Sequence, residues 1–592
     1  LRPGAGGWHG CMAGDKSLVL GNTKREAEEE SEENMSSLNI PVGISDFAEI
    51  RRNGYYYVDK SALIGELLKT EATKVTLITR PRRFGKTLAM SMLAHFFDLR
   101  EENGELFAGL QVSEDPEILK NWMNQWPVVF LTLKNIDGLT FSSAYGQLKY
   151  EIADLYKGYD FLTEGEGLME EERELFDQIR QRRAGDTEVR RSLQFLLQLL
   201  QEHFGKQVIL LLDEYDVPLA KASAGGYYEE MLEVIRSMMI TALKDNPCLR
   251  FAVITGCLKI AKESIFTGTN NFVSDTISST RLNEYFGFTQ KEVDKLLWDG
   301  GMRDRKAEIQ KWYDGYHFGE VDVYCPWDVM NYVRDLQINP AAVPAGYWKN
   351  TSDNGIIRSF IDYAGGSISM KLETLMSGGY IVQKIEENLT YDILHSTEEN
   401  LWSILYLTGY LTRVRNDGQL SPVREGETAL MIPNEEIREI YETTVMKWFD
   451  DSARSWNRKA LFAAVWEGNE ERITEEMNRL LRKTISYHDY REDFYHAFLA
   501  GIFAGAGFMV QSNREHGEGR SDVAVYDPAE SRAVIFEVKY SKTLASMEGD
   551  CERAAEQIER QGYARELKDD YDRVMCYGIS FYKKRCLVKK ND

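Results

Sequence analysis

The sequence has no apolar run long enough to cross a membrane. Its longest uncharged apolar stretch, residues 497–510, is 14 residues long and contains three glycines, whereas a transmembrane helix needs about 20 apolar residues. We expect this stretch to form a buried helix, and we expect the protein to have no membrane partner.

Cysteine and histidine are scarce. The 592 residues include seven cysteines, which are far apart and form no CxxC pair, and eight histidines, which form no HExxH motif. The cysteine pattern argues against a disulfide framework and against a zinc ribbon, and it is typical of a reducing cytoplasm. His488 and His496 lie eight positions apart on a predicted helix, where packing is a better interpretation than metal binding.

Positive charge is in deficit. The chain has 71 Lys and Arg against 94 Asp and Glu, a net charge of −23. Such an acidic chain is a poor candidate for coating nucleic acid, because phosphates are neutralised by Lys and Arg. Binding of nucleic acid at a local site is not excluded.

The N-terminal residues lack the pattern of a folded segment. Residues 1–34 contain glycine-rich and glutamate-rich stretches, and the first patterned sequence follows Met35. No charged region is followed by an apolar one, so we expect no secretory signal peptide. We expect residues 1–38 to be a disordered tail, or in part an upstream extension.

Short apolar runs alternate with longer amphipathic stretches over residues 39–289. The runs are rich in β-branched residues and apolar on both faces, as in buried parallel strands. They cover residues 75–79, 128–133, 208–212 and 251–255. One of the helical patterns between them, residues 189–204, stops at Gly205. Strands that alternate with helices predict a doubly wound α/β domain.

The strand signal fades after Gly287. A capping box of Thr289 and Glu292 predicts the start of a helix, and residues 290–475 are expected to be mostly helical. The aromatic segment 312–318 in this region fits either a winged-helix or lid element or plain core packing.

A third unit is predicted over residues 476–592. The pattern indicates a helix through Glu492, strands at 521–526 and 533–540, and a helix through Gln557. Basic residues near the C-terminus fit either phosphate contact or a solubilising end: Lys583, Lys584, Arg585, Lys589 and Lys590.

A loop joins the first predicted strand to a helix at 88–97. Residues 79–87 read TRPRRFGKT. At such a junction, backbone N–H groups and the helix N-terminus can bind phosphate, Lys86 can reach the β- and γ-phosphates, and the Thr87 hydroxyl can ligate Mg²⁺. Arg80 stands where the Walker A pattern G-x-x-x-x-G-K-[ST] has its first glycine, so a chance GKT that caps a helix is the alternative.

The run at 208–212 ends in two carboxylates, as in a Walker B strand. Asp213 and Glu214 are costly to bury unless they meet a cation or hydrogen-bond donors. Asp213 can hold the Mg²⁺ through Thr87, and Glu214 can polarise the water that attacks the γ-phosphate. A strand that runs into a solvated acidic turn is the alternative. Thr255, at the end of a later strand, fits either orientation of that water or a plain strand end.

The nucleotide is therefore expected at this loop and strand. The residues expected to bind it are Arg83, Phe84, Gly85, Lys86, Thr87 and Asp213. For Arg82 and Arg83, contact with phosphate, contact with a neighbouring subunit and exposure to solvent are alternatives.

Four segments together resemble the bacterial AAA-ATPase-like family. They are residues 55–61 (YYYVDKS), 80–87 (RPRRFGKT), 212–218 (LDEYDVP) and 254–256 (ITG). The resemblance implies a P-loop NTPase domain at 39–289 that is commonly joined to a C-terminal PD-(D/E)XK nuclease-like domain. An arginine at the position of Arg80 is usual in this family.

Two predicted strands near the C-terminus carry carboxylates. Asp522 and Glu537 are 15 positions apart across a turn, and Glu537 shares one strand face with Lys539. Two carboxylates suit a hard cation such as Mg²⁺, which can activate water, and Lys539 can orient that water. A surface hairpin with exposed ion pairs is the alternative.

This arrangement resembles the PD-(D/E)XK pattern, with Ser521 in place of proline. The resemblance implies an α/β restriction-endonuclease-like fold in which Asp522 and Glu537 are metal ligands. It also implies that Glu492, on the preceding helix, is an additional acidic ligand and that Gln557 is an auxiliary polar residue.

Two functions of different classes are open. In the first, the protein binds and hydrolyses ATP and controls a Mg²⁺-dependent nuclease that acts on DNA, with Glu214, Asp522, Glu537 and Lys539 as catalytic residues. In the second, it is a nucleotide-dependent switch or scaffold whose nuclease-like domain only binds a partner or nucleic acid. The intact carboxylate site favours the first, with ATP and Mg²⁺ as cofactors, a cytoplasmic location, and homo-oligomer formation left open.

Overall fold

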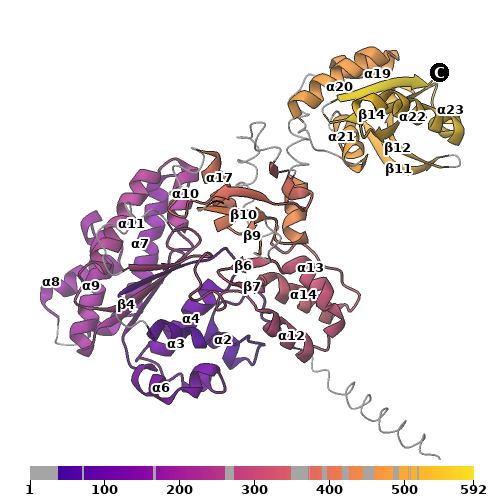
Figure 1. The fold of residues 1–592 in the computed structure, drawn as a ribbon. Helices are drawn as coiled ribbons and strands as arrows, with labels where there is room; N and C mark the ends of the chain where they lie inside the picture. The colour runs from indigo at the N-terminus through magenta and orange to yellow at the C-terminus, as the bar shows by residue number, and fades with distance from the viewer. Residues whose placement is uncertain are drawn as a thin grey trace, which may run out of the picture.

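The structure is a computed structural model of the chain (Figure 1). It describes residues 38–69, 73–164, 168–259, 272–348, 371–372, 374–389, 397–415, 424, 426–444, 459–484, 492–504, 506, 508–516, 519–583 and 585–591. The predicted N-terminal tail therefore lies outside the described residues, except for Leu38. Within these ranges no helix is long and apolar enough to cross a membrane, and the six described cysteines are free thiols.

A five-stranded parallel sheet forms the centre of the first unit. Its strands are β1 (Val75–Thr79), β2 (Val128–Thr132), β3 (Val208–Asp213), β4 (Leu249–Gly256) and β5 (Phe272–Asp275). Their order is β2-β3-β4-β1-β5, and every neighbouring pair is parallel. The first four strands confirm the sequence prediction, whereas β5 was not predicted.

Helices cover both faces of this sheet, as expected for a doubly wound arrangement. On one face Ile78 and Val253 share a core with α4 (Lys86–Phe97). On the other face Leu77 and Ile254 share a second core with three long helices, α7 (Phe141–Lys157), α9 (Asp186–Phe204) and α11 (Tyr228–Leu243). The remaining helices of the unit are α2 (Phe47–Arg52), α3 (Ala62–Leu68), α5 (Gly104–Phe107), α6 (Pro116–Trp122), α8 (Glu170–Arg180) and α10 (Val217–Gly225).

The middle region is largely helical but also contains short strands. Its helices are α12 (Gln290–Asp299), α13 (Lys306–Tyr313), α14 (Pro326–Ile338) and α17 (Glu398–Leu407). The predicted capping box is present at the start of α12. The strands are β6 (Tyr316–Phe318), β7 (Val321–Val323), β8 (Ile381–Lys384), β9 (Thr412–Arg413) and β10 (Glu427–Met431), of which the last three form a sheet in the order β8-β10-β9. Tyr313, Tyr316 and Phe318 are buried, so core packing accounts for these aromatic side chains.

The C-terminal unit is a mixed sheet flanked by helices. The strands β11 (Met509–His516), β12 (Gly519–Asp527), β13 (Arg532–Tyr540), β14 (Arg573–Tyr582) and β15 (Arg585–Asn591) lie in sequence order, and only β13 and β14 are parallel. Its helices are α19 (Lys459–Glu467), α20 (Glu470–Thr484), α21 (Glu492–Ala504), α22 (Met547–Gln561) and α23 (Tyr563–Asp570).

Three details of this unit bear on the sequence expectations. The stretch 497–510 is not one helix, because α21 ends at Ala504 and Met509 begins β11. Of the basic C-terminal residues, for which phosphate contact and a solubilising end were alternatives, Arg585, Lys589 and Lys590 belong to β15, which pairs with β14. Side chains of α19 and α20 pack into the same core as β12, β13 and β14, so the expected boundary at 476 falls inside α20.

Candidate nucleotide and metal sites

The loop between β1 and α4 is shaped by two left-handed residues. Arg83 has φ 73° and Gly85 has φ 82°, and a Cβ atom at Gly85 would meet open space. In the described chain, the N–H groups of Gly85, Lys86 and Thr87 meet no protein acceptor, as is usual in the first turn of a helix. These donors at the start of α4 form a concave site suited to an anion.

The Lys86 side chain is folded into this loop. Its Nζ donates to the carbonyl oxygens of Arg80 and Pro81, each at 3.1 Å, and lies 3.3 Å from Glu214 Oε1. Burial opposes the charged form, but Cys257 and the carboxylates of Glu214, Asp216 and Asp213 outweigh it and raise the Lys86 pKa. A fixed ammonium group therefore stands at the loop.

The structure brings Thr87, Asp213 and Thr255 together, although they lie on three separate elements. Thr87 Oγ1 donates to Asp213 Oδ2 at 2.9 Å, and Thr255 Oγ1 donates to Asp213 Oδ1 at 2.6 Å. A third hydroxyl, Thr132 Oγ1, lies 3.3 Å from Asp213 Oδ2. Burial raises the Asp213 pKa, and the threonine hydrogen bonds partly offset this effect.

Glu214 follows Asp213 in a conformation that is rare for a residue with a side chain. Its φ is 54°, in the left-handed region that costs free energy outside glycine. Its N–H donates to Thr255 Oγ1 at 3.4 Å. Its buried Oε2 has no hydrogen-bond partner in the described structure. The backbone thus directs a carboxylate with a free oxygen toward the loop.

Asp216 is a buried residue of this centre that the sequence analysis did not single out. Its carboxylate accepts hydrogen bonds from the N–H groups of Cys257 and Leu258, each at 3.0 Å. Burial, followed by the charge of Glu214, raises its pKa to about 6. Asp216 therefore ties the turn after β3 to the end of β4. The sequence feature that could have identified Asp216 is its position in the LDEYDVP segment, residues 212–218.

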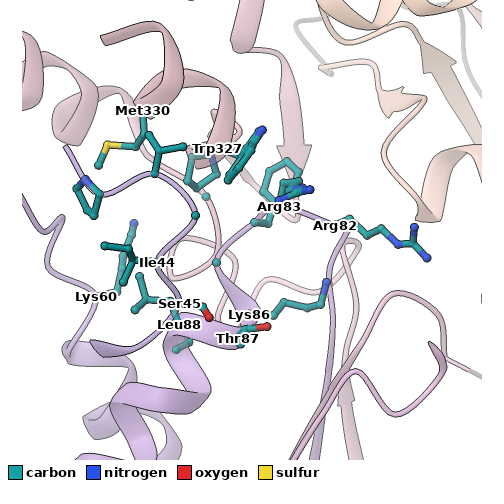
Figure 2. A pocket seen from close by; sticks show the side chains of 18 of the residues that line it. Ile44, Ser45, Lys60, Arg82, Arg83, Lys86, Thr87, Leu88, Trp327 and Met330 are labelled. Carbon is teal, nitrogen blue, oxygen red and sulfur yellow. The ribbon is translucent and has the colours of Figure 1, made fainter. Parts of the chain in front are cut away.

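A cavity of about 540 Å³ opens beside the loop. Figure 2 shows Lys86 and Thr87 on one side of it and Trp327 and Met330, from α14, on another. The third wall is the N-terminal segment 41–45. The loop and the helical middle region therefore share one chamber, whose lining also includes the apolar side chains of Val42, Ile44 and Met330.

Two arginines of the loop are placed differently. The Arg83 guanidinium stacks on the Trp327 ring, with 4.1 Å to the ring centroid. Arg82 is exposed and extends away from the other labelled side chains of Figure 2. The stack of Arg83 on Trp327 joins the loop directly to α14.

Arg80 and Phe84 face the protein core. Arg80 is fully buried, and its guanidinium donates to the carbonyl oxygens of Thr79, Asp275 and Leu282 at 2.8, 2.9 and 3.3 Å. The Phe84 ring packs against Tyr316 and Phe318, with centroids 4.9 and 5.1 Å away. Only the backbone of Phe84 is therefore available to a nucleotide, and both side chains anchor the loop.

We expect Arg80→Ala to destabilise the protein by about 3 kcal/mol, because it leaves buried carbonyl oxygens without donors and opens a cavity. For a domain of this size that corresponds to a melting temperature roughly 6–12 °C lower. Arg82→Ala, which removes an exposed neighbour, should change stability by less than about 0.5 kcal/mol. Thermal melting followed by circular dichroism compares the two variants. Equal melting temperatures would contradict the anchoring role of Arg80.

The second candidate site lies at one end of β12 and β13. Val523 pairs with Phe536 in this antiparallel ladder, and the same register places Asp522 opposite Glu537. Asp522 Oδ2 accepts a hydrogen bond from the Val538 N–H at 2.7 Å. Residues directly opposite each other point to the same face, so the two carboxylates share one side of the sheet.

Glu537 is the buried member of this pair. Its side chain is 1% exposed, and Oε1 lies 3.3 Å from Lys539 Nζ. The other oxygen, Oε2, has no hydrogen-bond partner in the described residues. Burial, then the charge of Asp522, raises the Glu537 pKa to about 7. An exposed hairpin with ordinary ion pairs does not fit this environment.

The other residues expected at this site have mixed outcomes. Glu492 is the first residue of α21, but its side chain and that of Ser521 lie outside the described side chains. Gln557 is half-buried on α22 and forms no hydrogen bond with Asp522 or Glu537 in the described structure. His496 was assigned to packing, but its Nε2 lies 3.4 Å from Asp522 Oδ2. Its spacing of four from Glu492 was the signal that could have found it.

Both donor sets fit a hard divalent cation. At the loop the set is the Thr87 hydroxyl with the Asp213 carboxylate, and in the C-terminal unit it is the unpartnered Glu537 oxygen beside Asp522. Across the described part of the chain, no group of three or more His, Cys, Asp or Glu side chains is arranged so that it could hold a metal ion.

Comparison with known proteins agrees with this geometry. Residues 41–266 match the family model described as "Predicted AAA-ATPase", and residues 490–591 match the model described as "PD-(D/E)XK nuclease superfamily". A protein of Azotobacter chroococcum mcd 1, described as "Uncharacterized protein in vnfD 5'region", is 24% identical over 563 residues, which cover 92% of this chain and 97% of the relative. The resemblance drawn from the sequence is thereby confirmed: the chain carries a predicted AAA-ATPase domain followed by a PD-(D/E)XK nuclease superfamily domain.

Proposed function

We propose that the protein binds and hydrolyses ATP at the loop between β1 and α4 and that this activity controls a metal-dependent nuclease in its C-terminal unit, with DNA as the substrate. The observation that carries the ATPase part is the convergence of Lys86, Thr87 and Glu214 on one cavity, with the buried Asp213 hydrogen-bonded to Thr87 behind it. The buried Glu537 carboxyl beside Asp522 and Lys539 carries the nuclease part.

At the first site each residue has a distinct task. The N–H groups at the start of α4 bind the phosphates, and Lys86 compensates the charge of the β- and γ-phosphates. Glu214 accepts a proton from the attacking water, for which its unpartnered oxygen is free. The Thr255 hydroxyl orients Asp213 and the Glu214 backbone. Mg²⁺ bound with ATP would neutralise phosphate charge, and Thr87 and Asp213 are the residues that would hold it.

The apolar part of the cavity is suited to the nucleoside. Val42 and Ile44 on one side and Met330 and Trp327 on the other can enclose a base. Because α14 contributes to this enclosure, nucleotide binding can change the position of the middle region. Such a change is the simplest physical link between the nucleotide site and the rest of the chain.

At the second site, Lys539 positions the attacking water and offsets charge on the phosphodiester, while Val538 fixes the orientation of Asp522 through its N–H. A divalent cation held by Asp522 and Glu537, with Glu492 as a further ligand, would lower the pKa of a bound water and stabilise charge on the phosphate.

A second candidate function is a nucleotide-dependent switch whose nuclease-like unit only binds a partner. The absence, among the described residues, of a group of three or more His, Cys, Asp or Glu side chains that could hold a metal ion favours this alternative.

We expect Glu214→Gln to retain ATP binding and to slow hydrolysis by at least about 100-fold, because the amide cannot accept the proton of water. Glutamine has the same shape, so the contact with Lys86 persists in weaker form. Binding of a fluorescent ATP analogue and release of phosphate measure the two quantities. Unchanged hydrolysis in Glu214→Gln would exclude this residue as the base.

Glu202→Gln is the matched control, since Glu202 is an exposed residue of α9. It should leave both binding and hydrolysis unchanged.

A further inference from the structure

The cavity beside the phosphate loop has a strongly basic lining. Its described lining includes these Lys and Arg residues: Lys60, Arg82, Arg83, Lys86, Lys134 and Lys221. Two of them are paired with carboxylates, Lys60 with Glu292 at 2.7 Å and Lys221 with Asp137 at 3.3 Å. Their charge is therefore already compensated within the protein.

The three cations of the loop itself also have defined positions. Lys86 is held by two carbonyl oxygens and by Glu214. The Arg83 guanidinium stacks on Trp327, and Arg82 extends away from the other labelled side chains of Figure 2. Of these three, Lys86 is the one directed at the phosphate site.

Lys134 is the remaining basic residue of this lining. Its side chain is exposed, and its ammonium group forms no ion pair or hydrogen bond with any described residue. A cation at the wall of a cavity raises the local concentration of anions. Lys134 can therefore meet an anionic ligand without first breaking a contact with another described residue.

The backbone of Lys134 is tied to the end of β3, where Asp213 and Glu214 lie. Thr132 pairs with Asp213 in the parallel ladder, and its Oγ1 lies 3.3 Å from Asp213 Oδ2. The Leu133 N–H donates to the Asp213 carbonyl oxygen at 2.9 Å, and the Lys134 N–H donates to Thr132 Oγ1 at 3.5 Å. Ligands of open parallel sheets bind outside the carboxyl ends of the strands. Lys134 thus stands at the edge of the sheet where the γ-phosphate would lie.

We propose that Lys134 is a further catalytic residue of the ATPase site, whose ammonium group contacts the γ-phosphate and stabilises the charge that develops on it during hydrolysis. The inference rests on the proposed ATPase function and adds a residue to it. Water adds to the γ-phosphorus, its proton passes to Glu214, and the bond to the bridging oxygen breaks with its electron pair leaving on ADP. Lys134 offsets charge on the γ-oxygens, and its flexible stem lets the ammonium group follow them.

Phosphate release and calorimetric titration of the full-length chain with ATP or ADP, each with Mg²⁺, test this role. Lys134→Ala should lower kcat by at least about 100-fold and ATP affinity by no more than about tenfold. ADP affinity should change by less than about threefold, because ADP lacks the γ-phosphate and a uniform binding contact is not involved. Unchanged ADP affinity would also show that the variant is folded.

Two further variants separate charge from shape. Lys134→Arg keeps the charge and should stay within about tenfold of the wild-type kcat. Lys221→Ala is the matched control, because Lys221 lines the same cavity but is paired with Asp137. Its loss should change kcat by less than about threefold.

Binding of ADP together with aluminium fluoride, which mimics the phosphoryl group in transfer, gives a readout that needs no turnover. The wild type should bind this combination at least about tenfold more tightly than ADP alone, and Lys134→Ala should lose the gain. A wild-type kcat in Lys134→Ala, or an undiminished gain, would overturn the assignment of Lys134 while leaving the proposed ATPase intact. A wild type that releases no phosphate from ATP would overturn the ATPase proposal itself, and the role of Lys134 with it.

Discussion

Replacing Lys86 with alanine is expected to lower ATP affinity by at least about 100-fold, because charge-assisted hydrogen bonds to two phosphates contribute about 1.5–3 kcal/mol each. Lys86 is the buried ammonium group at the loop, held by two carbonyl oxygens and Glu214. Isothermal titration with ATP and Mg²⁺ measures the loss. Hydrolysis should fall below detection, since an unbound nucleotide cannot react.

The matched control for this experiment is Lys221→Ala. Lys221 lines the same cavity but is exposed and forms an ion pair with Asp137 at 3.3 Å. Its loss should change ATP affinity by less than about threefold, as for a screened surface charge. Equal ATP affinity in the wild type and in Lys86→Ala, with both proteins folded, would remove the loop as the phosphate site.

Asp522→Ala and Lys539→Ala are expected to differ in metal binding although both should lose DNA cleavage. Asp522→Ala removes a metal ligand, so metal binding at the C-terminal site and cleavage of DNA should both be lost. Lys539→Ala removes a cation from beside the metal, so metal binding should persist or tighten. Cleavage should still fall by about 100-fold or more, because water positioning and charge compensation are lost.

Mn²⁺ titration and a cleavage assay on linear DNA, run on the same preparations, separate the two effects. Lys542→Ala is the control, because Lys542 is an exposed lysine just beyond β13. ATP hydrolysis should survive in all three variants if the two sites are chemically separate. Parallel loss of metal binding in Asp522→Ala and Lys539→Ala would contradict the separate roles given to these residues.

The sequence predicted the strands that are apolar on both faces. The runs at 75–79 and 208–212 are recognisable because a central parallel strand must be apolar throughout. β5 was missed because it is a four-residue strand with one fully buried side chain. β15 was missed because its basic residues hide the alternation of buried Cys586 and Val588 with more exposed neighbours. Such strands are defined by their partners in the sheet more than by their own composition.

In the candidate sites, too, some residues could be predicted from local sequence and others depend on distant parts of the chain. Lys86, Thr87, Asp213 and Glu214 could be found because motif spacing fixes their place on strand and helix ends. The burial of Arg80 and the position of His496 could not be found, because each depends on elements distant in sequence. Arg80 is held by carbonyl groups of β5 and of residue 282, and His496 meets Asp522 only when α21 packs on the sheet.

The most direct test of the account is the rate at which the full-length protein cleaves linear DNA with Mn²⁺ or Mg²⁺, with and without ATP. We expect metal-dependent cleavage by the wild type whose rate differs by at least about fivefold with and without ATP, as for a typical coupling between two sites. In Lys86→Ala the difference should vanish, and in Asp522→Ala cleavage itself should vanish. Absence of cleavage by the wild type with either metal, or a rate indifferent to ATP, would contradict the proposed nucleotide-controlled nuclease.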